Sequence, residues 1–393
     1  MVELTKEEEE ILDGSLGEAL AEAMKVVVKV GEALEAEKLV PISHAHVSGI
    51  SYKNIGEAGL DFLSSLAEMG AKVMVPSTIN PAVMDVEKWR EMGVTENVAE
   101  KQRAILNALK SMGFKLTLTC TPYLYERVKR GSQVAWAESN AVLYGNSVCG
   151  LMTNREGGPL ALMEALVGRA PYTGYRLKER RKPDFVLDVC SIRDKIRDKF
   201  LYPALGYYLG LSASEYTPAI RGLRPEDLTN EKLKAMLAAA GASGSLTFVH
   251  IEGLAPQVPA ESVQVERPNI SDLLSCLPAP FSDEGDVLMG CPHLSPSELA
   301  WLAEIVSKYG RPKRRVIVFS ARQSLRYASH AIRLLRSMGI EVYFDTCMVV
   351  ADLHAMGVSE CTVDSAKAAY YLASQGYDVR LFSRRDIRRV LYG

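Results

Sequence analysis

Hydrophobic positions along this chain predict helices that end at a glycine and pass directly into a strand. Four stretches share a leucine, a glycine four residues later, and a β-rich run that ends at a small polar residue or a cysteine; they are 66–78, 109–120, 335–347 and 372–383. A glycine at that position lets the backbone leave the helix with a positive φ. Repeated helix-to-strand units are typical of open parallel sheets.

The alternation is steadiest from about Asp286 to the end of the chain, which predicts a doubly wound α/β domain there. For the whole chain we expect an α/β fold of several parallel or mixed sheets with helices on both faces. We predict a helical segment (1–38), an α/β domain (39–150), a middle domain with its connection (151–285) and a C-terminal domain (286–393). A proline-rich stretch, 253–268, is the expected inter-domain connection.

In parallel sheets, ligands bind beyond the carboxyl ends of the strands. Two cysteines that are far apart in the sequence, Cys120 and Cys347, fall at such predicted strand ends. Their equivalent positions predict a site assembled between domains. The motif after the first predicted strand, with Ser77, Thr78 and Asn80, would present hydroxyls and an amide at the same kind of edge.

A polar, glycine-bearing loop at 46–57 precedes a predicted helix that begins near Gly56. Backbone amides at a helix amino terminus can bind a carboxylate or a phosphate. The alternative is a surface loop in which Asn54 caps the helix. Our candidates are His46 and Glu57 as catalytic residues, and, for substrate binding, Ser48, Gly49, Lys53, Asn54, Ser77, Thr78, Asn80 and Asn140.

Composition narrows the class of protein. The chain has 393 residues and a formal net charge of −2, so its charge gives no reason to expect nucleic acid or an anionic membrane as partner. Its acidic amino terminus lacks the features of a secretory signal, and no apolar run approaches the ~20 residues that span a bilayer. We therefore expect a cytoplasmic protein. Seven cysteines without CxxC spacing do not suggest a disulfide framework.

The cysteines fall into different settings. Cys190 and Cys276 lie in apolar segments and are expected to be buried small hydrophobes. Cys120, Cys291 and Cys347 lie beside Thr, Pro or His at predicted strand ends or in loops. A proline after a cysteine, as at Cys291, is frequent at iron–sulfur ligands. On the residues alone, these three are either metal or cluster ligands or ordinary thiols.

Several motifs together resemble the aconitase X family in its archaeal, large-subunit form. They are HVSGISYKNIGEAGLDFL, VPSTINPAVMD, TCTPY, AWAESNAVLYGNSVCG, GCPHLSPSEL and EVYFDTCMVV, in one order over nearly the whole chain. The resemblance implies an iron–sulfur hydro-lyase with a cluster, expected to be [4Fe–4S], held by Cys120, Cys291 and Cys347. Cys361, predicted to open a helix whose dipole lowers its pKa, and Cys149 are reserve ligands.

The resemblance also implies a partner and a reaction. Aconitase-like domains without the swivelling fourth domain would need a small subunit, which would supply that domain and a serine base. Should this chain act alone, Ser48 and Ser77 are the first candidates for the base. The implied reaction is the dehydration of a β-hydroxy acid, 5-phosphomevalonate to trans-anhydromevalonate 5-phosphate in a modified mevalonate pathway to isoprenoids. Dehydration of cis-3-hydroxyproline is the alternative, and a non-catalytic carboxylate-binding protein is the alternative of another class.

Overall fold

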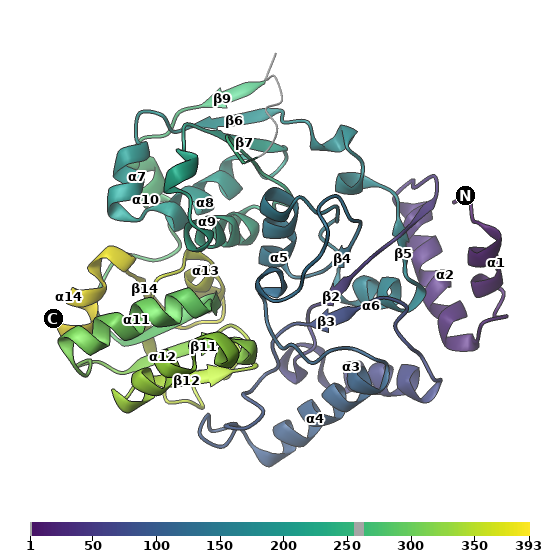
Figure 1. Ribbon diagram of the computed structural model, residues 1–393, viewed down its shortest axis with the longest axis horizontal. Helices are drawn as coiled ribbons and strands as arrows, with labels where there is room; N and C mark the ends of the chain where they lie inside the picture. Colours follow the sequence, from purple (N-terminus) through teal and green to yellow (C-terminus); the bar gives the residue numbers. More distant parts are fainter. Residues whose placement is uncertain (1, 255–262) are drawn as a thin grey trace. The chain divides into compact units, whose positions relative to one another are not determined.

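The computed structural model describes residues 2–254 and 263–393, so part of the predicted proline-rich connection lies outside the described residues. The chain forms two compact units (Figure 1). Unit 1 comprises Met1–Val83 and Thr95–Arg181, and unit 2 comprises Met84–Val94 and Lys182–Gly393. The short segment Met84–Val94 therefore leaves unit 1 and packs within unit 2.

Unit 1 is built around a small parallel sheet with the strand order β3-β2-β4, and a separate antiparallel pair, β1-β5. Its strands are β1 (Leu39–Pro41), β2 (Ala45–Val47), β3 (Ser77–Ile79), β4 (Ala135–Trp136) and β5 (Arg169–Pro171). Its α-helices are α1 (Lys6–Leu12), α2 (Glu18–Ala33), α3 (Tyr52–Glu68), α4 (Glu96–Ser111), α5 (Ser139–Tyr144) and α6 (Gly158–Val167). A π-helical turn, Gly145–Cys149, follows α5 directly.

The strands of unit 1 are shorter than the sequence predicts. The run 71–76 is not a strand, because the amides of Val73 and Met74 donate to the carbonyls of Met112 and Ala165 at the ends of helices. The run before Cys120 follows β3 only through a bridge from Lys115 to Thr78 and single hydrogen bonds. The backbone turns at Leu118, whose φ is 46°. The predicted strand that ends at Cys120 was therefore wrong, and of the predicted strand that ends at Thr78 only the last two residues lie in β3.

Unit 2 contains two parallel sheets. The first has the strand order β8-β7-β6-β9 and the second the order β12-β11-β10-β13-β14. The first sheet consists of β6 (Phe185–Asp188), β7 (Pro218–Arg221), β8 (His250–Ile251) and β9 (Gln264–Glu266), with the helices α7 (Arg193–Lys199), α8 (Tyr202–Ser212), α9 (Asn230–Ser243) and α10 (Ile270–Ser275). The second consists of β10 (Asp286–Leu294), β11 (Val316–Ser320), β12 (Glu341–Phe344), β13 (Glu360–Val363) and β14 (Asp378–Leu381), with α11 (Pro296–Tyr309), α12 (Leu325–Ser337), α13 (Ala366–Ser374) and α14 (Ile387–Tyr392).

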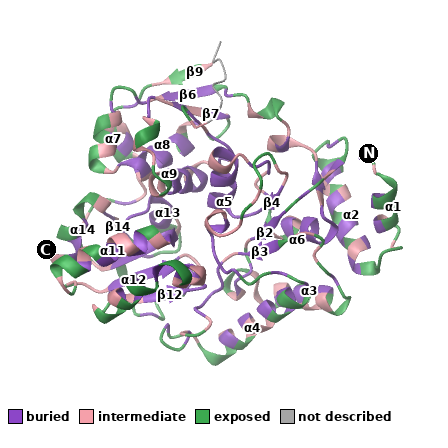
Figure 2. Ribbon diagram, viewed as in Figure 1, coloured by how far each residue is buried: buried purple, intermediate pink, exposed green. Residues whose placement is uncertain are grey.

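The five-stranded sheet is parallel throughout. One face is covered by α11, α12 and α14, whose apolar side chains form a single core with those of the strands. Residues on the other face, such as Leu288 and Ile317, are fully buried as well. Figure 2 colours each described residue by its burial. The strand order reverses between β10 and β13, which is where such sheets bind ligands.

The α/β class with helix-covered parallel sheets is thus confirmed. The four glycines predicted to end helices, Gly70, Gly113, Gly339 and Gly376, all have positive φ, between 78° and 95°. The domain boundaries given above remain predictions. Within the described residues, no helix has both the length and the apolar character needed to cross a membrane.

Candidate active site

Cys291 lies in a bulge at the carboxyl end of β10. The parallel register between β10 and β11 is regular up to Met289 and resumes only at Leu294. Gly290 opens the bulge with a φ of 113°, and a Cβ there would lie 2.1 Å from the carbonyl oxygen of Phe319. Only glycine permits this close approach. The bulge takes Cys291 out of the regular strand pairing, at the edge where the strand order reverses.

Cys347 follows the carboxyl end of β12 in the same sheet. The residue two positions earlier, Asp345, has a φ of 63°, which turns the backbone out of the strand direction. The carbonyl oxygen of Cys347 accepts hydrogen bonds from the amides of Val350 and Ala351 at 3.2 and 2.9 Å. His293 Nε2 lies 2.8 Å from the carbonyl oxygen of Thr346, and so connects the bulge to the segment before Cys347.

Cys120 lies in unit 1 and does not follow a strand. Its segment runs beside β3, where the amide of Thr119 donates to the carbonyl of Ile79 at 3.2 Å. Asn140, fully buried on α5, donates from Nδ2 to the carbonyl oxygen of Cys120 at 3.0 Å. The same amide lies 3.0 Å from the hydroxyl of Tyr123, whose ring stacks on Tyr144. Asn140 therefore fixes the backbone that presents Cys120.

A positive-φ residue stands one or two positions before each of these three cysteines: Leu118, Gly290 and Asp345. The other four cysteines have no such residue in the two positions before them. Leu118 and Asp345 are not glycines, and such strained conformations gather at functional sites. All three thiols are nearly buried, with 6 to 9% of each residue exposed. The backbone thus distinguishes the three predicted ligands from the remaining cysteines.

The two reserve cysteines, Cys361 and Cys149, have surroundings that disfavour the thiolate form needed in a ligand. Cys361 does not open a helix as predicted but lies within β13, and burial raises the pKa of its thiol to about 12. Burial likewise raises the pKa of Cys149 to about 11. The prediction for Cys190 was wrong, because this residue is exposed after β6, where a hydrogen bond to Asp188 raises its pKa. Cys276 is half-buried beside Tyr207, Ala239 and Ala366 rather than fully buried.

Thiolates are the usual ligands of iron–sulfur clusters, and each of these three cysteines can supply one. Next to Cys347, the fully buried hydroxyl of Thr346 has no hydrogen-bond partner among the described residues, as expected of a side chain that contacts a bound group. The described His, Cys, Asp and Glu side chains contain no group of three that could by itself hold a metal ion. The cluster assignment therefore remains a prediction supported by local geometry.

His46 on β2 and Thr78 on β3 are fully buried and form a polar group with Asn80, which is half-buried just after β3. His46 Nδ1 lies 2.8 Å from Thr78 Oγ1, and Nε2 lies 3.1 Å from Asn80 Oδ1. Burial lowers the pKa of His46 to about 4, although the hydrogen bond to Asn80 opposes this. The ring is therefore neutral at pH 7, and with Nε2–H donating to Asn80, its Nδ1 accepts from Thr78. The contact of Nδ1 with Thr78 fixes the ring, and Nε2 binds the side chain of Asn80.

The structure gives different surroundings to the residues of the 46–57 loop. Ser48 is half-buried, and Gly49 is exposed with a φ of 73°. Gly56 departs from helical geometry inside α3, so regular helix begins just after it, close to the predicted start. Glu57 lies on the surface, where it accepts from Lys101 at 2.9 Å and from the hydroxyl of Tyr52 at 2.8 Å.

The remaining predicted residues of unit 1 include Lys53 and Asn54 in the first turn of α3 and Ser77 on β3. Lys53 and Asn54 are exposed at the start of α3, and Asn54 Oδ1 accepts from the hydroxyl of Ser51. The hydroxyl of Ser77 donates to the carbonyl of Val75 at 2.8 Å. Sequence reasoning missed Gln102, a fully buried side chain on α4 that binds backbone groups of Ile50, Tyr52 and Val83 and so holds this loop in place.

Two further charged groups support the cysteine segments of unit 2. Arg322 donates to Asp345 at 2.8 Å and to Asp85 at 2.8 Å, so the segment Met84–Val94 is tied to the turn before Cys347. On the other side, Lys234 donates to the carbonyl of His293 at 2.8 Å and to Glu298. Neither role could be predicted, because the partners lie far apart in the sequence.

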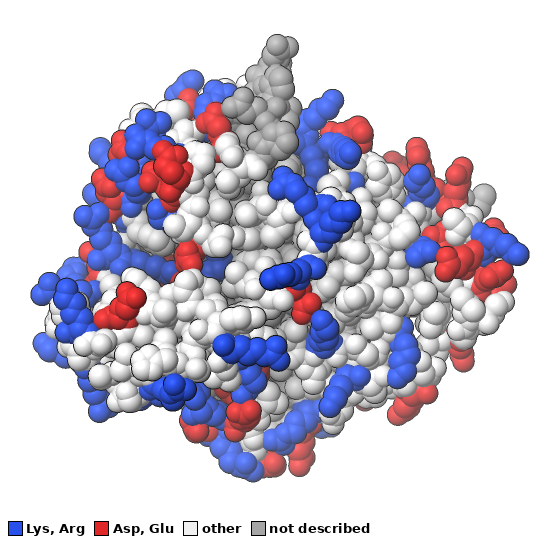
Figure 3. All heavy atoms as spheres, viewed as in Figure 1, with Lys and Arg blue, Asp and Glu red and all other residues white. Residues whose placement is uncertain are grey.

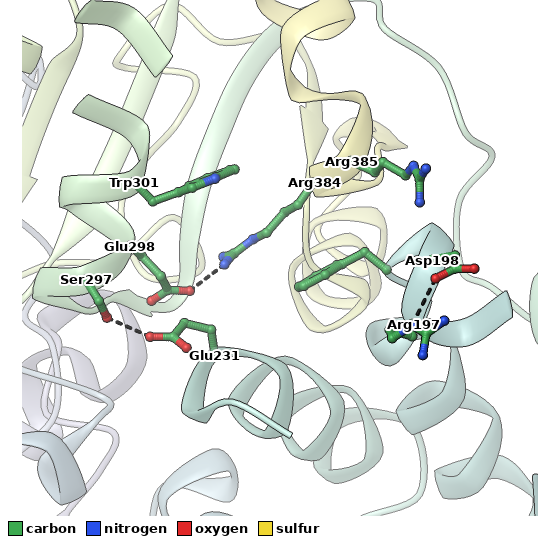
Figure 4. A pocket seen from close by; sticks show the side chains of 9 residues that line it. Arg197, Asp198, Glu231, Ser297, Glu298, Trp301, Arg384 and Arg385 are labelled. Atoms are coloured by element: carbon green, nitrogen blue, oxygen red, sulfur yellow. Dashed lines mark hydrogen bonds and ion pairs between the residues drawn. The ribbon is translucent and has the colours of Figure 1, made fainter. Parts of the chain in front are cut away.

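A pocket of about 530 Å³ lies beside this second group (Figure 4). Its guanidinium, Arg384, lies between the rings of Trp301 and Phe200 and binds Glu298 and Asp364, each at 2.6 Å. The pocket is also lined by Arg197, Asp198, Glu231, Ser297 and Arg385. Its acidic and basic side chains balance, so the pocket does not attract one sign of charge. On the face drawn in Figure 3, Lys and Arg are likewise interspersed with Asp and Glu.

Comparison with known proteins places these features in one family. Models of the aconitase X first, second and third domains match residues 1–179, 183–275 and 286–392. The phosphomevalonate dehydratase large subunits of Methanocaldococcus jannaschii and Aeropyrum pernix are 36% and 41% identical, over 99% and 96% of this chain and 99% and 97% of theirs.

Longer relatives and a solved structure agree with this. The chain is 35% identical to the cis-3-hydroxy-L-proline dehydratase of Pseudomonas aeruginosa over 92% of its length, but spans only 65% of that protein. The crystal structure of the holo form of Thermococcus kodakaraensis aconitase X superposes with a TM-score of 0.88 at 36% identity, covering 98% of this chain and 99% of that one. The chain belongs to the aconitase X family.

Proposed function

We propose that this chain is the large subunit of an iron–sulfur dehydratase that converts 5-phosphomevalonate to trans-anhydromevalonate 5-phosphate. The observation that carries the proposal is the positive-φ turn before each of Cys120, Cys291 and Cys347, which sets these thiols apart in a chain that spans nearly the whole length of phosphomevalonate dehydratase large subunits. The proposed pathway is a modified mevalonate route to isoprenoids.

In this proposal the three cysteines hold the cluster, expected to be [4Fe–4S]. When bound, the cluster supplies a Lewis acid that stabilises the hydroxide leaving the β-carbon. The chain's own residues bind and orient the substrate. Asn80, fixed by neutral His46, presents its amide at the carboxyl edge of β3, where it would hold the substrate carboxylate or hydroxyl.

We propose roles for the other residues that were predicted from the sequence. Ser48, the backbone amide of Gly49, Lys53, Asn54, Ser77, Thr78 and Asn140 are the proposed substrate-binding residues. His46 and Glu57 remain predicted catalytic residues, although the contacts of His46 already give it a positioning role. We propose that the small subunit brings the swivelling domain and a serine that removes the proton α to the carboxylate. The complex is then a cytoplasmic heterodimer.

The test is an anaerobic preparation of the chain co-expressed with its small subunit. Iron and acid-labile sulfide are counted, and 5-phosphomevalonate is supplied as substrate. We expect a cluster and a product that has lost one water molecule. A cluster-containing complex that leaves 5-phosphomevalonate unchanged would contradict the proposed substrate.

The same assay tests one alternative substrate. The similarity to cis-3-hydroxy-L-proline dehydratase favours that amino acid as a second candidate substrate. The complex should turn over 5-phosphomevalonate with the higher kcat/KM, and the reverse order would favour the alternative. Protein that binds a carboxylate ligand without iron or turnover would instead indicate a non-catalytic binding protein.

A further inference from the structure

The backbone just before Cys347 is fixed by side chains from several elements. The carboxylate of Asp345 accepts from Arg322 Nε at 2.8 Å, and the carbonyl of Thr346 faces His293 Nε2 at 2.8 Å. These contacts engage both residues that precede the cysteine. The 345–347 loop therefore has one well-defined conformation rather than being a loose connection after β12.

Arg322 is itself held in place by a buried carboxylate. Its Nη2 donates to Asp85 Oδ1 at 2.8 Å, and Asp85 Oδ2 accepts from the amide of Phe344 at 2.8 Å. Asp85 is fully buried, so its carboxylate is shielded from bulk water. The last residue of β12 and the turn that follows are thus fixed by the same pair of side chains.

Within the 345–347 loop, one buried polar atom lacks a hydrogen-bond partner among the described residues, the hydroxyl oxygen of Thr346. Thr346 is fully buried, and its hydroxyl has no hydrogen-bond partner anywhere in the part of the chain that the structure describes. Buried polar atoms in native proteins nearly always have a partner, and a valine of the same shape would avoid the cost of burying this one. A buried hydroxyl without a partner in the described part of the chain indicates a partner that binds to the folded chain.

We infer that the Thr346 hydroxyl donates a hydrogen bond to a sulfur atom of the cluster that Cys347 holds. The inference rests on the proposed function, since it needs the cluster at Cys347. A donor to a cluster sulfur stabilises the more negative, reduced state and raises the reduction potential. Thr346 is then a binding residue that adjusts the cluster's electronic properties, beside the cysteine that ligates it.

The experiment compares Thr346→Val, Thr346→Ser and a matched control in the two-subunit complex. Thr362 supplies the control, because it is a fully buried threonine in the same sheet whose hydroxyl donates to the carbonyl of Ser282 at 3.1 Å. Two quantities are measured: the thermal midpoint of cluster-free protein, and the midpoint potential of the anaerobically reconstituted cluster.

In cluster-free protein, Thr346→Val should leave the thermal midpoint unchanged or raise it, whereas Thr362→Val should lower it because a satisfied hydrogen bond is lost. With the cluster bound, Thr346→Val should shift the reduction equilibrium roughly five- to tenfold toward the oxidised state, the effect of one hydrogen bond. Thr346→Ser should restore the original potential, and Thr362→Val should not change it.

A Thr346→Val potential equal to that of the original protein would overturn the inference, as would a clear loss of stability in the cluster-free variant. These results are separable from failure of the proposed function. Cys347→Ser is the reference: if it keeps a normal cluster, or if the original protein forms none, the cluster assignment and the inference both fail. If Cys347→Ser loses the cluster while Thr346→Val keeps its potential, only the inference fails.

Discussion

Single residues decide where a thiol of this chain can serve as a ligand. Cys361 and Cys291 lie on the adjacent strands β13 and β10. Cys361 is held in regular strand pairing, where burial raises its pKa and disfavours the thiolate. Cys291 lies in the bulge that Gly290 opens. The same sheet thus buries one cysteine as an inert thiol and presents the other at its carboxyl edge.

The cysteine variants test this difference directly. Replacing Cys120, Cys291 or Cys347 singly with serine should abolish stable iron binding and turnover, because each removes a proposed thiolate ligand. Cys190→Ser and Cys361→Ser are the controls and should keep both. Iron content and visible absorbance of anaerobic protein provide the measurement, and a normal cluster in one of the first three variants removes that residue from the ligand set.

A second prediction concerns substrate contacts. Asn80→Ala and Ser48→Ala should each lower kcat/KM by roughly ten- to a hundredfold, the effect of one buried, charge-assisted hydrogen bond of about 1.5–3 kcal/mol. Cluster absorbance should be unchanged, because neither side chain is a proposed ligand. Normal kinetics in both variants would mean that these loops are scaffold, and would direct attention to Asn140 and Arg322.

At the scale of residues, the three candidate ligand cysteines could be proposed from the sequence. The backbone turns that precede them could not. Polar neighbours such as Thr119 and Thr346 can be read from the sequence. The turns at Leu118 and Asp345 could not be predicted, because neither residue is one that favours positive φ strongly enough to signal it. Buried supports such as Gln102 and Asp85 were missed for another reason, since a single polar side chain does not reveal its distant partners.

At the scale of elements, the local sequence pattern predicted strands correctly where the strands pair regularly with neighbouring strands. The units that end in β12 and β14 form as predicted, because long parallel neighbours satisfy their backbone. In unit 1, carbonyls at helix ends take the amides of Val73 and Met74 instead. β13 was missed, because the short run before α13 resembles the beginning of a helix in sequence.

The bulge in β10 allows a test of its own. Gly290→Ala should lower both stability and iron content, because the added Cβ would lie 2.1 Å from the carbonyl oxygen of Phe319 at a φ that alanine rarely adopts. Gly157→Ala is the control, with an ordinary φ of −69° and open space around its Cβ. Urea unfolding and iron analysis provide the measurements, and full cluster content in Gly290→Ala would mean that the bulge does not position Cys291.

The buried ion group behind the bulge predicts a pH dependence. Burial alone would raise the pKa of Glu298, but Lys234 and Arg384 outweigh it and lower the pKa to about 2 from its usual 4.5. A carboxylate with a lowered pKa stabilises the fold above pH 4.5, and this contribution, on the order of 3 kcal/mol, is lost as the pH falls toward 2. The urea concentration at the midpoint of unfolding should therefore fall steeply as the pH is lowered from 6 to 2.

Glu298→Gln should remove most of that slope and cost about 3–5 kcal/mol at neutral pH, because it leaves Lys234 and Arg384 without their shared partner. Arg267→Ala is the control, since its ion pair with Asp188 is largely exposed and should contribute little. An unchanged pH slope in Glu298→Gln would assign the acid sensitivity to other groups.

At the scale of the whole molecule, the division of the chain into two units is the feature that local sequence patterns predict least well. Met84–Val94 follows soon after β3 in the sequence, yet it packs within unit 2. Asp85 binds Arg322 and Phe344 there, and Gly93 lies against the carbonyl of Ala355. Such an excursion is stabilised by partners more than two hundred residues away, which no local window of sequence contains.

The last prediction concerns the partner subunit. Relatives that match this chain over nearly their whole length are named large subunits, whereas this chain spans 65% of the cis-3-hydroxy-L-proline dehydratase of P. aeruginosa. If the small subunit supplies the serine base, the purified chain should fold and bind iron but dehydrate 5-phosphomevalonate at a negligible rate. Adding the small subunit should restore turnover in proportion to complex formed, measured by titration at constant large subunit. Substantial turnover by the chain alone would place the base on this chain, and Ser48→Ala and Ser77→Ala would then distinguish its first two candidates.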